Sequence, residues 1–203
     1  RIYRAEQLKN LEIKNPERYT DRLMNALQKE LRLDRQPRHI ECFDNSNLQG
    51  AHPVASCVVF RDGKPSRKEY RHFNIKTVEG PDDYASMREV VFRRYTRLMA
   101  EGAALPDLVI ADGGKGQMGV IHEVLEHLGL DIPIAGLAKD DRHRTAELLC
   151  GFPPLLVGIR PTSPLFHFLS QIQEEVHRFA ITFHRQKRSK AFIHSELEQI
   201  EGV

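Results

Sequence analysis

The sequence predicts an α/β protein whose mixed sheet has three antiparallel strands followed by two parallel ones, flanked by helices. The apolar run "VASCVVF" (54–60) is followed by Asp62-Gly63, a strong hairpin signal between strand patterns. A buried strand at 107–111, a helix at 116–128 and a strand at 132–140 then follow one another. That succession implies a parallel pair joined by a crossover helix.

Length and composition agree with a globular protein. The chain has 203 residues, of which 40% are apolar and 29% charged, which suits one domain with an appended segment. No apolar run is long enough to span a membrane, and the opening "RIYRAEQLKN" is too charged for a signal peptide. We therefore expect no membrane partner and a cytoplasmic location. The missing initiator Met indicates a fragment of something longer.

The cysteine pattern gives no sign of a structural cross-link. Cys42, Cys57 and Cys150 are odd in number and form no CxxC pair. We expect neither disulfides nor a cysteine-based zinc site, and a reducing compartment fits.

The first part of the chain is expected to hold a leader and the antiparallel strands. Residues 1–35 read as a polar helical leader or the remnant of a linker, interrupted by Pro16. The strands are expected at 39–44, 54–60 and 67–76, and the last of these is polar enough for a sheet edge.

Helices dominate the rest of the chain. Asp82 and the preceding Pro81 signal the start of a helix that Gly102 stops. The segment 145–158 reads as a hairpin or a loop excursion, and Pro164 after Thr162-Ser163 predicts the start of a last helix, to about residue 185.

Two acidic residues recur in the same context, each at the end of a predicted strand. Asp44 ends the first strand, and Asp112 ends the fourth, where Gly113-Gly114 lets the backbone turn and leaves room for a ligand. Adjacent parallel strands would bring the two carboxylates together, and their repulsion would then need a cation. Oxygen ligands favour Mg²⁺ or Mn²⁺. Alternatively, each Asp caps the turn that follows it; taken as a pair, they favour a metal site.

Other motifs leave alternatives open. "ADGGKGQ" fails the phosphate-loop pattern, because Lys115 is followed by Gly116. His177 and His184 share a face of the last helix, and their positions alone do not choose between them. The basic clusters "RKEYRH" (67–72), "RRYTR" (93–97) and "HRQKRSK" (184–190) fit either a solvated surface or contact with a polyanion.

Four stretches together resemble one known family. "IECFDNSNLQG", the long segment that opens "ASCVVFRDGKPSRKEYRHF", "PDLVIADGGKGQ" and "EEVHRFAITFHRQKR" are similar to the C-terminal half of UvrC, the incision subunit of bacterial nucleotide excision repair. The resemblance covers about residues 36–203 and implies a ribonuclease-H-like endonuclease domain. It also implies a catalytic Asp-Asp-His set, which by motif falls on Asp44, Asp112 and His177; His184 is the weaker candidate.

The resemblance implies a function as well. The domain would be a divalent-metal-dependent endonuclease that hydrolyses a DNA phosphodiester bond, the 5′ incision beside a lesion. Damaged double-stranded DNA would be the substrate, and UvrB would be a partner of the full-length protein. The basic residues expected to contact phosphates are Lys115, Arg178, Arg185, Lys187 and Arg188. Asp83 is linked to activity in the family, although helix capping explains it equally well.

The resemblance also leaves parts of the family unmatched. Neither the GIY-YIG nuclease domain nor the helix-hairpin-helix motifs of UvrC occur in this sequence, and the UvrB-binding segment is expected upstream of residue 1. Two rival functions use the same fold, a binding module with a dead site and a transposase-like strand-transfer domain. The intact set of Asp44, Asp112 and His177 argues against the first, and the length of the resemblance argues against the second.

Overall fold

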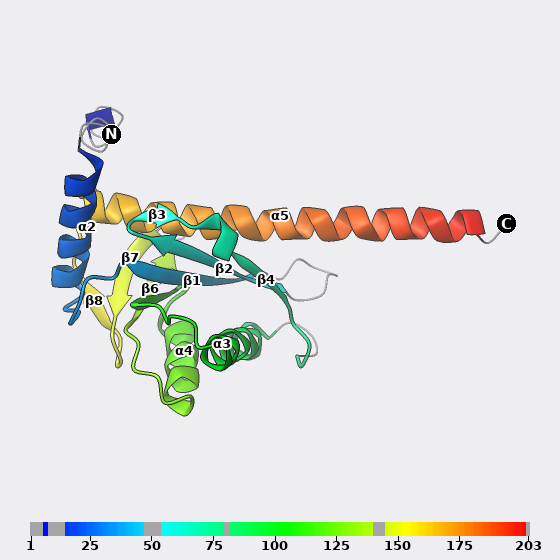
Figure 1. The fold of residues 1–203 in the computed structure, drawn as a ribbon, viewed down its shortest axis with the longest axis horizontal. Coiled ribbons are helices and arrows are strands. Elements are labelled where there is room, and N and C mark those ends of the chain that lie inside the picture. The colour runs from blue at the N-terminus through cyan, green and yellow to red at the C-terminus, as the bar shows by residue number, and fades with distance from the viewer. Residues whose placement is uncertain (1–5, 8–14, 47–53, 79–81, 140–144, 202–203) are drawn as a thin grey trace.

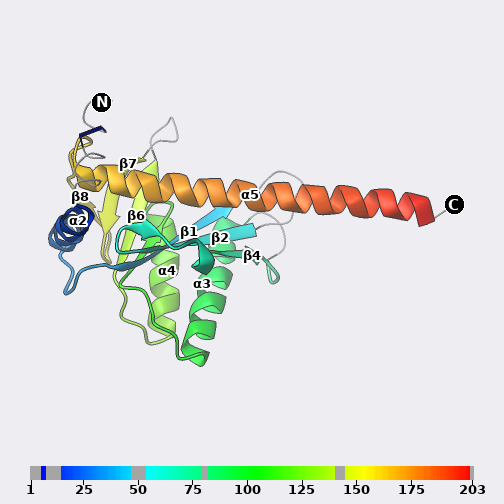
Figure 2. The ribbon, with the colours of Figure 1, turned by 45° about the horizontal axis from the view of Figure 1, so that its top comes forward.

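A mixed eight-stranded sheet forms the centre of the fold (Figure 1). The long helix α5 crosses one face of the sheet, and α3 and α4 cover the other (Figures 1 and 2). The computed structural model describes residues 6–7, 15–46, 54–78, 82–139 and 145–201. Of residues 46, 145–146 and 183–201 it describes the backbone only.

The order of elements along the chain follows the prediction closely. The helices are α2 (Pro16–Glu30), η1 (Arg67–Glu69, a 3₁₀ helix), α3 (Asp83–Ala100), α4 (Lys115–His127) and α5 (Pro164–Glu201). The strands are β1 (His39–Ser46), β2 (Val54–Arg61), β3 (Lys64–Pro65), β4 (Arg71–Asn74), β5 (Leu108–Ala111), β6 (Ile134–Lys139), β7 (Thr145–Cys150) and β8 (Leu155–Val157).

The predicted combination of antiparallel and parallel strands is confirmed. β2 pairs antiparallel with β1 and β4, and β5 pairs parallel with both β1 and β6. The turn after β2 has positive φ at Asp62 (53°) and Gly63 (78°), as a two-residue hairpin requires. The segment 145–158 forms the hairpin β7–β8, which extends the sheet beyond β6.

The prediction of one strand over 67–76 is wrong. The chain leaves the sheet as η1 and returns only for β4. The side chain of Glu69 accepts hydrogen bonds from Ser66 Oγ (2.7 Å) and Arg61 Nε (2.6 Å). These bonds hold the segment as a turn beside β2, where an alternating pattern alone would have continued the strand.

The predicted end of the last helix near residue 185 is also wrong, because α5 continues to Glu201. Neither Gly nor Pro occurs between residues 165 and 201, so nothing in the local sequence stops the helix. The start is as predicted: Ser163 Oγ accepts a hydrogen bond from the backbone N–H of Phe166 at 3.2 Å.

The alternation of side chains along β1 divides the core into two layers. Ile40, whose register partner is Phe60, faces α5, and Phe60 packs edge-on against Phe168 at 5.9 Å. Phe43 faces α3 and packs edge-on against Tyr95 at 5.9 Å. Asp44 is four residues beyond Ile40, an even number, and therefore faces α5 as well.

The helix α2 belongs to the same apolar core. Leu23, Met24 and Leu27 are buried within the cluster that contains the sheet residues. The boundary at residue 35 between a leader and the domain stays a prediction.

A buried ionic network joins β1 to α3. The Glu41 carboxylate, 1% exposed, accepts hydrogen bonds from both sides of the Arg94 guanidinium at 2.6 and 2.7 Å and from Tyr95 Oη at 2.9 Å. His39 Nε2 lies 2.8 Å from it. Burial opposes ionisation of Glu41, but Arg94 and His39 outweigh it and lower the pKa of Glu41 to about 2.

Cys42, Cys57 and Cys150 are free thiols, as predicted. Within the described residues, no helix is long and apolar enough to cross a membrane.

Candidate metal centre

The two predicted acids lie on neighbouring parallel strands. Phe43 of β1 is in register with Ala111 of β5, and the backbone N–H of Asp112 donates to the carbonyl of Phe43 at 3.0 Å. Asp44 and Asp112 follow these partners directly, so their carboxylates leave the sheet side by side. Both residues are buried, at 7% and 9% exposure. β1 runs on to Ser46, so Asp44 lies within the strand rather than at its end.

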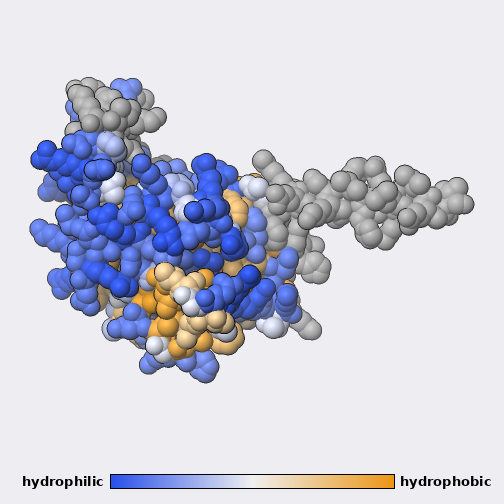
Figure 3. All heavy atoms as spheres, in the orientation of Figure 1, coloured by the Kyte–Doolittle hydropathy of each residue, from blue (hydrophilic) through white to orange (hydrophobic). Residues whose placement is uncertain are grey.

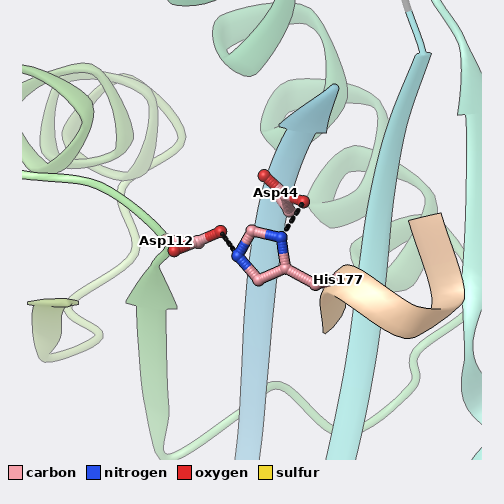
Figure 4. A group of neighbouring side chains, drawn as sticks. All are labelled: Asp44, Asp112 and His177. Atoms are coloured by element: carbon pink, nitrogen blue, oxygen red, sulfur yellow. Dashed lines mark ion pairs between the residues drawn. The ribbon is translucent and has the colours of Figure 1, made fainter. Parts of the chain in front are cut away.

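His177 reaches both carboxylates from the opposing layer. It lies on α5 next to the buried Val176, which packs against the sheet. Its Nε2 is 2.8 Å from Asp112 Oδ2, and its Nδ1 is 3.8 Å from Asp44 Oδ2 (Figure 4). The imidazole thus stands between the two acids, with 39% of its side chain exposed to solvent.

Two further side chains contact the group, and sequence reasoning missed both. Gln173 Nε2 donates to Asp112 Oδ1 at 2.8 Å, and Lys139 Nζ lies 3.3 Å from Asp112 Oδ2. Each had a signal in the sequence. Gln173 precedes His177 by one helical turn, and Lys139 ends β6, the parallel neighbour of β5.

The three ionisable groups shift one another's pKa. Burial raises the pKa of Asp44, and the nearby charge of Asp112 raises it further. Burial also opposes ionisation of Asp112, but contacts with His177 and Gln173 outweigh it and lower the pKa of Asp112. The contact with Asp112 in turn raises the pKa of His177. Among the described residues, His177 and Lys139 are the basic side chains that contact Asp112.

The group fits a divalent cation. One ligand atom from each of Asp44, Asp112 and His177 lies within 4.8 Å of the other two. Ligands about 2.1 Å from an ion are roughly 4 Å apart across it, so small side-chain movements suffice to enclose one ion. The two carboxylate oxygens suit a hard divalent cation, and the imidazole nitrogen is a softer donor at the third position. It is the one such group within the described part of the chain.

Of the two acids at the start of α3, Asp82 caps the helix. Asp82 is the N-cap and accepts a hydrogen bond from Ala85 N at 3.0 Å, as the helix-start signal predicts. Asp83 is the first residue of α3, and its backbone carbonyl accepts a hydrogen bond from Asn45 Nδ2 at 2.6 Å. Asp83 is not a member of the three-residue group.

The structure describes the side chains of only some of the residues predicted to contact DNA. Lys115 is exposed at the first residue of α4, three positions after Asp112. Arg178 is exposed on α5 and donates to Glu175 at 2.7 and 2.9 Å. The side chains of the other candidates on α5 lie outside the described residues; these are His184, Arg185, Lys187 and Arg188.

The chain is similar to known proteins along its whole length. Residues 28–181 match the family described as UvrC RNAse H endonuclease domain. The chain is 61% identical over 201 residues to the UvrABC system protein C of Bacteroides fragilis and 52% identical over 205 residues to that of Flavobacterium johnsoniae. These alignments cover 99% and 100% of this chain, but only 33% and 34% of those proteins. The chain therefore spans about a third of the length of the curated relatives that it matches.

A more distant similarity exists among solved structures. An Endonuclease V of Ciona intestinalis, in complex with a DNA that contains an inosine, has 17% sequence identity and a TM-score of 0.40. The match covers 58% of this chain and 56% of that one.

Proposed function

Because the chain belongs to the UvrC family and comprises its ribonuclease H endonuclease domain, we propose that it makes the 5′ incision of nucleotide excision repair. The reaction is the metal-dependent hydrolysis of a phosphodiester bond in damaged double-stranded DNA. The observation that carries this proposal is the convergence of Asp44, Asp112 and His177, whose ligand atoms lie within 4.8 Å of one another.

Asp44 and Asp112 would hold the metal ion. A bound Mg²⁺ or Mn²⁺ supplies a water of lowered pKa and neutralises charge on the phosphate. Gln173 fixes the orientation of Asp112, because its amide donates to Oδ1 and leaves Oδ2 turned toward the centre of the group. Lys139 Nζ, 3.3 Å from that oxygen, offers a second positive charge to an approaching phosphate.

His177 is suited to move a proton or to ligate the ion. Its side chain is 39% exposed, whereas the Asp44 and Asp112 side chains are 9% and 0% exposed. Contact with Asp112 raises the pKa of its ring, which favours a proton on it. A ring held by two acids and open to solvent can exchange that proton with a substrate oxygen.

The proposal extends to partners and place. Since relatives are about three times as long as this chain, lesion finding and binding to UvrB would belong to the longer protein, which we place in the cytoplasm. This chain would then supply the chemistry of the cut.

A nicking assay tests the proposal. A lesion-containing duplex labelled at one end is incubated with the chain and the partner proteins of the repair system, in Mn²⁺ or in EDTA. We expect one nick 5′ of the lesion that requires the metal, is lost in Asp112→Asn and persists in Asp34→Asn, a matched change of an exposed acid. Joined DNA ends would indicate strand transfer instead, and binding without a nick in any metal would indicate a binding module.

A further inference from the structure

The basic segment "RKEYRH" (67–72) lies against the turn of α5 beside the candidate metal centre. Tyr70 Oη donates a hydrogen bond to Glu175 at 2.9 Å, and its ring packs edge-on against Phe179 at 5.0 Å. The His72 ring stacks on the ring of Phe179, with centroids 3.7 Å apart. These contacts fasten η1 and β4 to the part of α5 that carries the catalytic candidate.

Four cationic residues belong to this junction, and two of them contact the Glu175 carboxylate. Arg178 donates to Glu175 at 2.7 Å, and Arg67 Nε lies 3.7 Å from it, with side chains 53% and 72% exposed. Lys68 and Arg71 are exposed on the same short segment. We call Arg67, Lys68, Arg71 and Arg178 the basic ledge.

Glu69, the acid of the segment 67–72 itself, does not neutralise the basic ledge. Glu69 accepts hydrogen bonds from both Nε and Nη2 of Arg61, at 2.6 and 2.8 Å, on the β2 side of η1. Arg71 donates to the carbonyls of Lys68 and Tyr70 at 3.0 and 2.7 Å, so its charge is held in place. Among the described residues, neither Lys68 nor Arg71 has an acidic partner, and the basic ledge keeps an excess of positive charge.

We propose that the basic ledge binds the sugar–phosphate backbone of the strand to be cut, at phosphates adjoining the one at the metal centre. This inference rests on the proposed function, which supplies the nucleic-acid substrate. The two buried acids repel a polyanion, and a cut between them therefore needs cations close by to hold the flanking backbone. Arg178 directly follows His177 in sequence, and the contacts of Tyr70 and Phe179 keep the rest of the basic ledge beside it.

Salt dependence of DNA binding tests the basic ledge. We compare the double variant Arg67→Gln/Lys68→Gln with Arg18→Gln/Arg22→Gln, which removes the same charge from exposed positions on α2. Arg71 is left unchanged because it braces the backbone of η1. Anisotropy of a fluorescent duplex is titrated in EDTA at several salt concentrations. The log–log salt slope should fall in magnitude by about two for the ledge variant, one for each lost phosphate contact, and stay at the wild-type value for the α2 control.

A slope equal to that of the wild type in the ledge variant overturns the inference. If the double variant does not fold, as judged by its melting temperature, Lys68→Gln alone carries the test with an expected change in slope of about one. Asp112→Asn separates this inference from the proposed function. It should keep the wild-type salt slope while losing incision; if it still cuts, the proposed function fails, and the basic ledge is judged by its slope alone.

Discussion

His177 Nε2 lies 2.8 Å from Asp112 Oδ2, and this contact joins the helical layer to the sheet at the candidate metal centre. The role that we propose for this ring in the incision can be tested by substitution.

We expect His177→Ala to lower the single-turnover incision rate by at least about 10²-fold, the low end for a lost acid–base group. His184→Ala serves as the comparison, because His184 is the other histidine predicted on the same helix face. It should alter mainly the affinity for DNA. If His184→Ala is the variant that fails to cut at saturating protein, the assignment of His177 is wrong.

Asp44→Asn should abolish incision without destabilising the fold. Asp44 is buried beside Asp112, so in the absence of metal its charge is repelled by a neighbour and poorly solvated. Thermal unfolding in EDTA should give a melting temperature equal to or above that of the wild type. A clear fall in both Asp44→Asn and Asp112→Asn would support capping of the following turns as their role.

Gln173→Leu should weaken the metal centre although Gln173 is not a ligand. Loss of the hydrogen bond to Asp112 Oδ1 frees that carboxylate to rotate. We expect a drop of about 10- to 100-fold in Mn²⁺ affinity or in incision rate, the usual effect of removing a partner of a metal ligand. Gln171→Leu, at an exposed position on the same helix, should match the wild type in calorimetric Mn²⁺ titration. Equal Mn²⁺ affinities in the two variants would show that Gln173 does not position Asp112 for the metal.

Glu41 should make folding stability depend on acid pH. Its pKa is lowered to about 2 from 4.5, so its stabilising contribution is complete above the unfolded-state value and is lost as the pH falls through about 2. Glu41→Gln leaves Arg94 buried without its carboxylate, and we expect a cost of about 3–5 kcal/mol near neutral pH. Urea unfolding at a series of pH values should show this gap narrow as the pH falls below the ordinary pKa.

Glu69→Gln is the control for that experiment. Glu69 also pairs with an arginine, but the Glu69 and Arg61 side chains are 29% and 43% exposed. A partly exposed pair contributes at most about 1 kcal/mol. An equal effect of the two substitutions would show that burial is not the cause.

The main strands and the two acids were predictable because each depends on short stretches of sequence. The apolar run of β2, the Asp62-Gly63 turn and the glycines after Asp112 each carry a local signal. His177 was not separable from His184 by periodicity, since both occupy one helix face, and the choice came from the resemblance to a family.

Features that depend on contacts between distant segments were missed. Lys139 and Gln173 become neighbours of Asp112 only through the pairing of β6 with β5 and the docking of α5. The 3₁₀ helix η1 replaced a predicted strand because Glu69 bonds to Arg61 and Ser66, which a strand pattern does not encode.

The division of the candidate metal centre between two layers makes its assembly depend on complete folding. Asp44 and Asp112 belong to the sheet layer, whereas His177 and Gln173 belong to α5. Figure 4 shows His177 meeting the two acids from the helix, and Gln173 contacts Asp112 from the same helix. A molecule in which α5 has detached, during synthesis or after damage, holds only part of the set. If the proposed nuclease activity is correct, an incompletely folded molecule lacks the assembled metal centre, and activity should appear only together with the native fold.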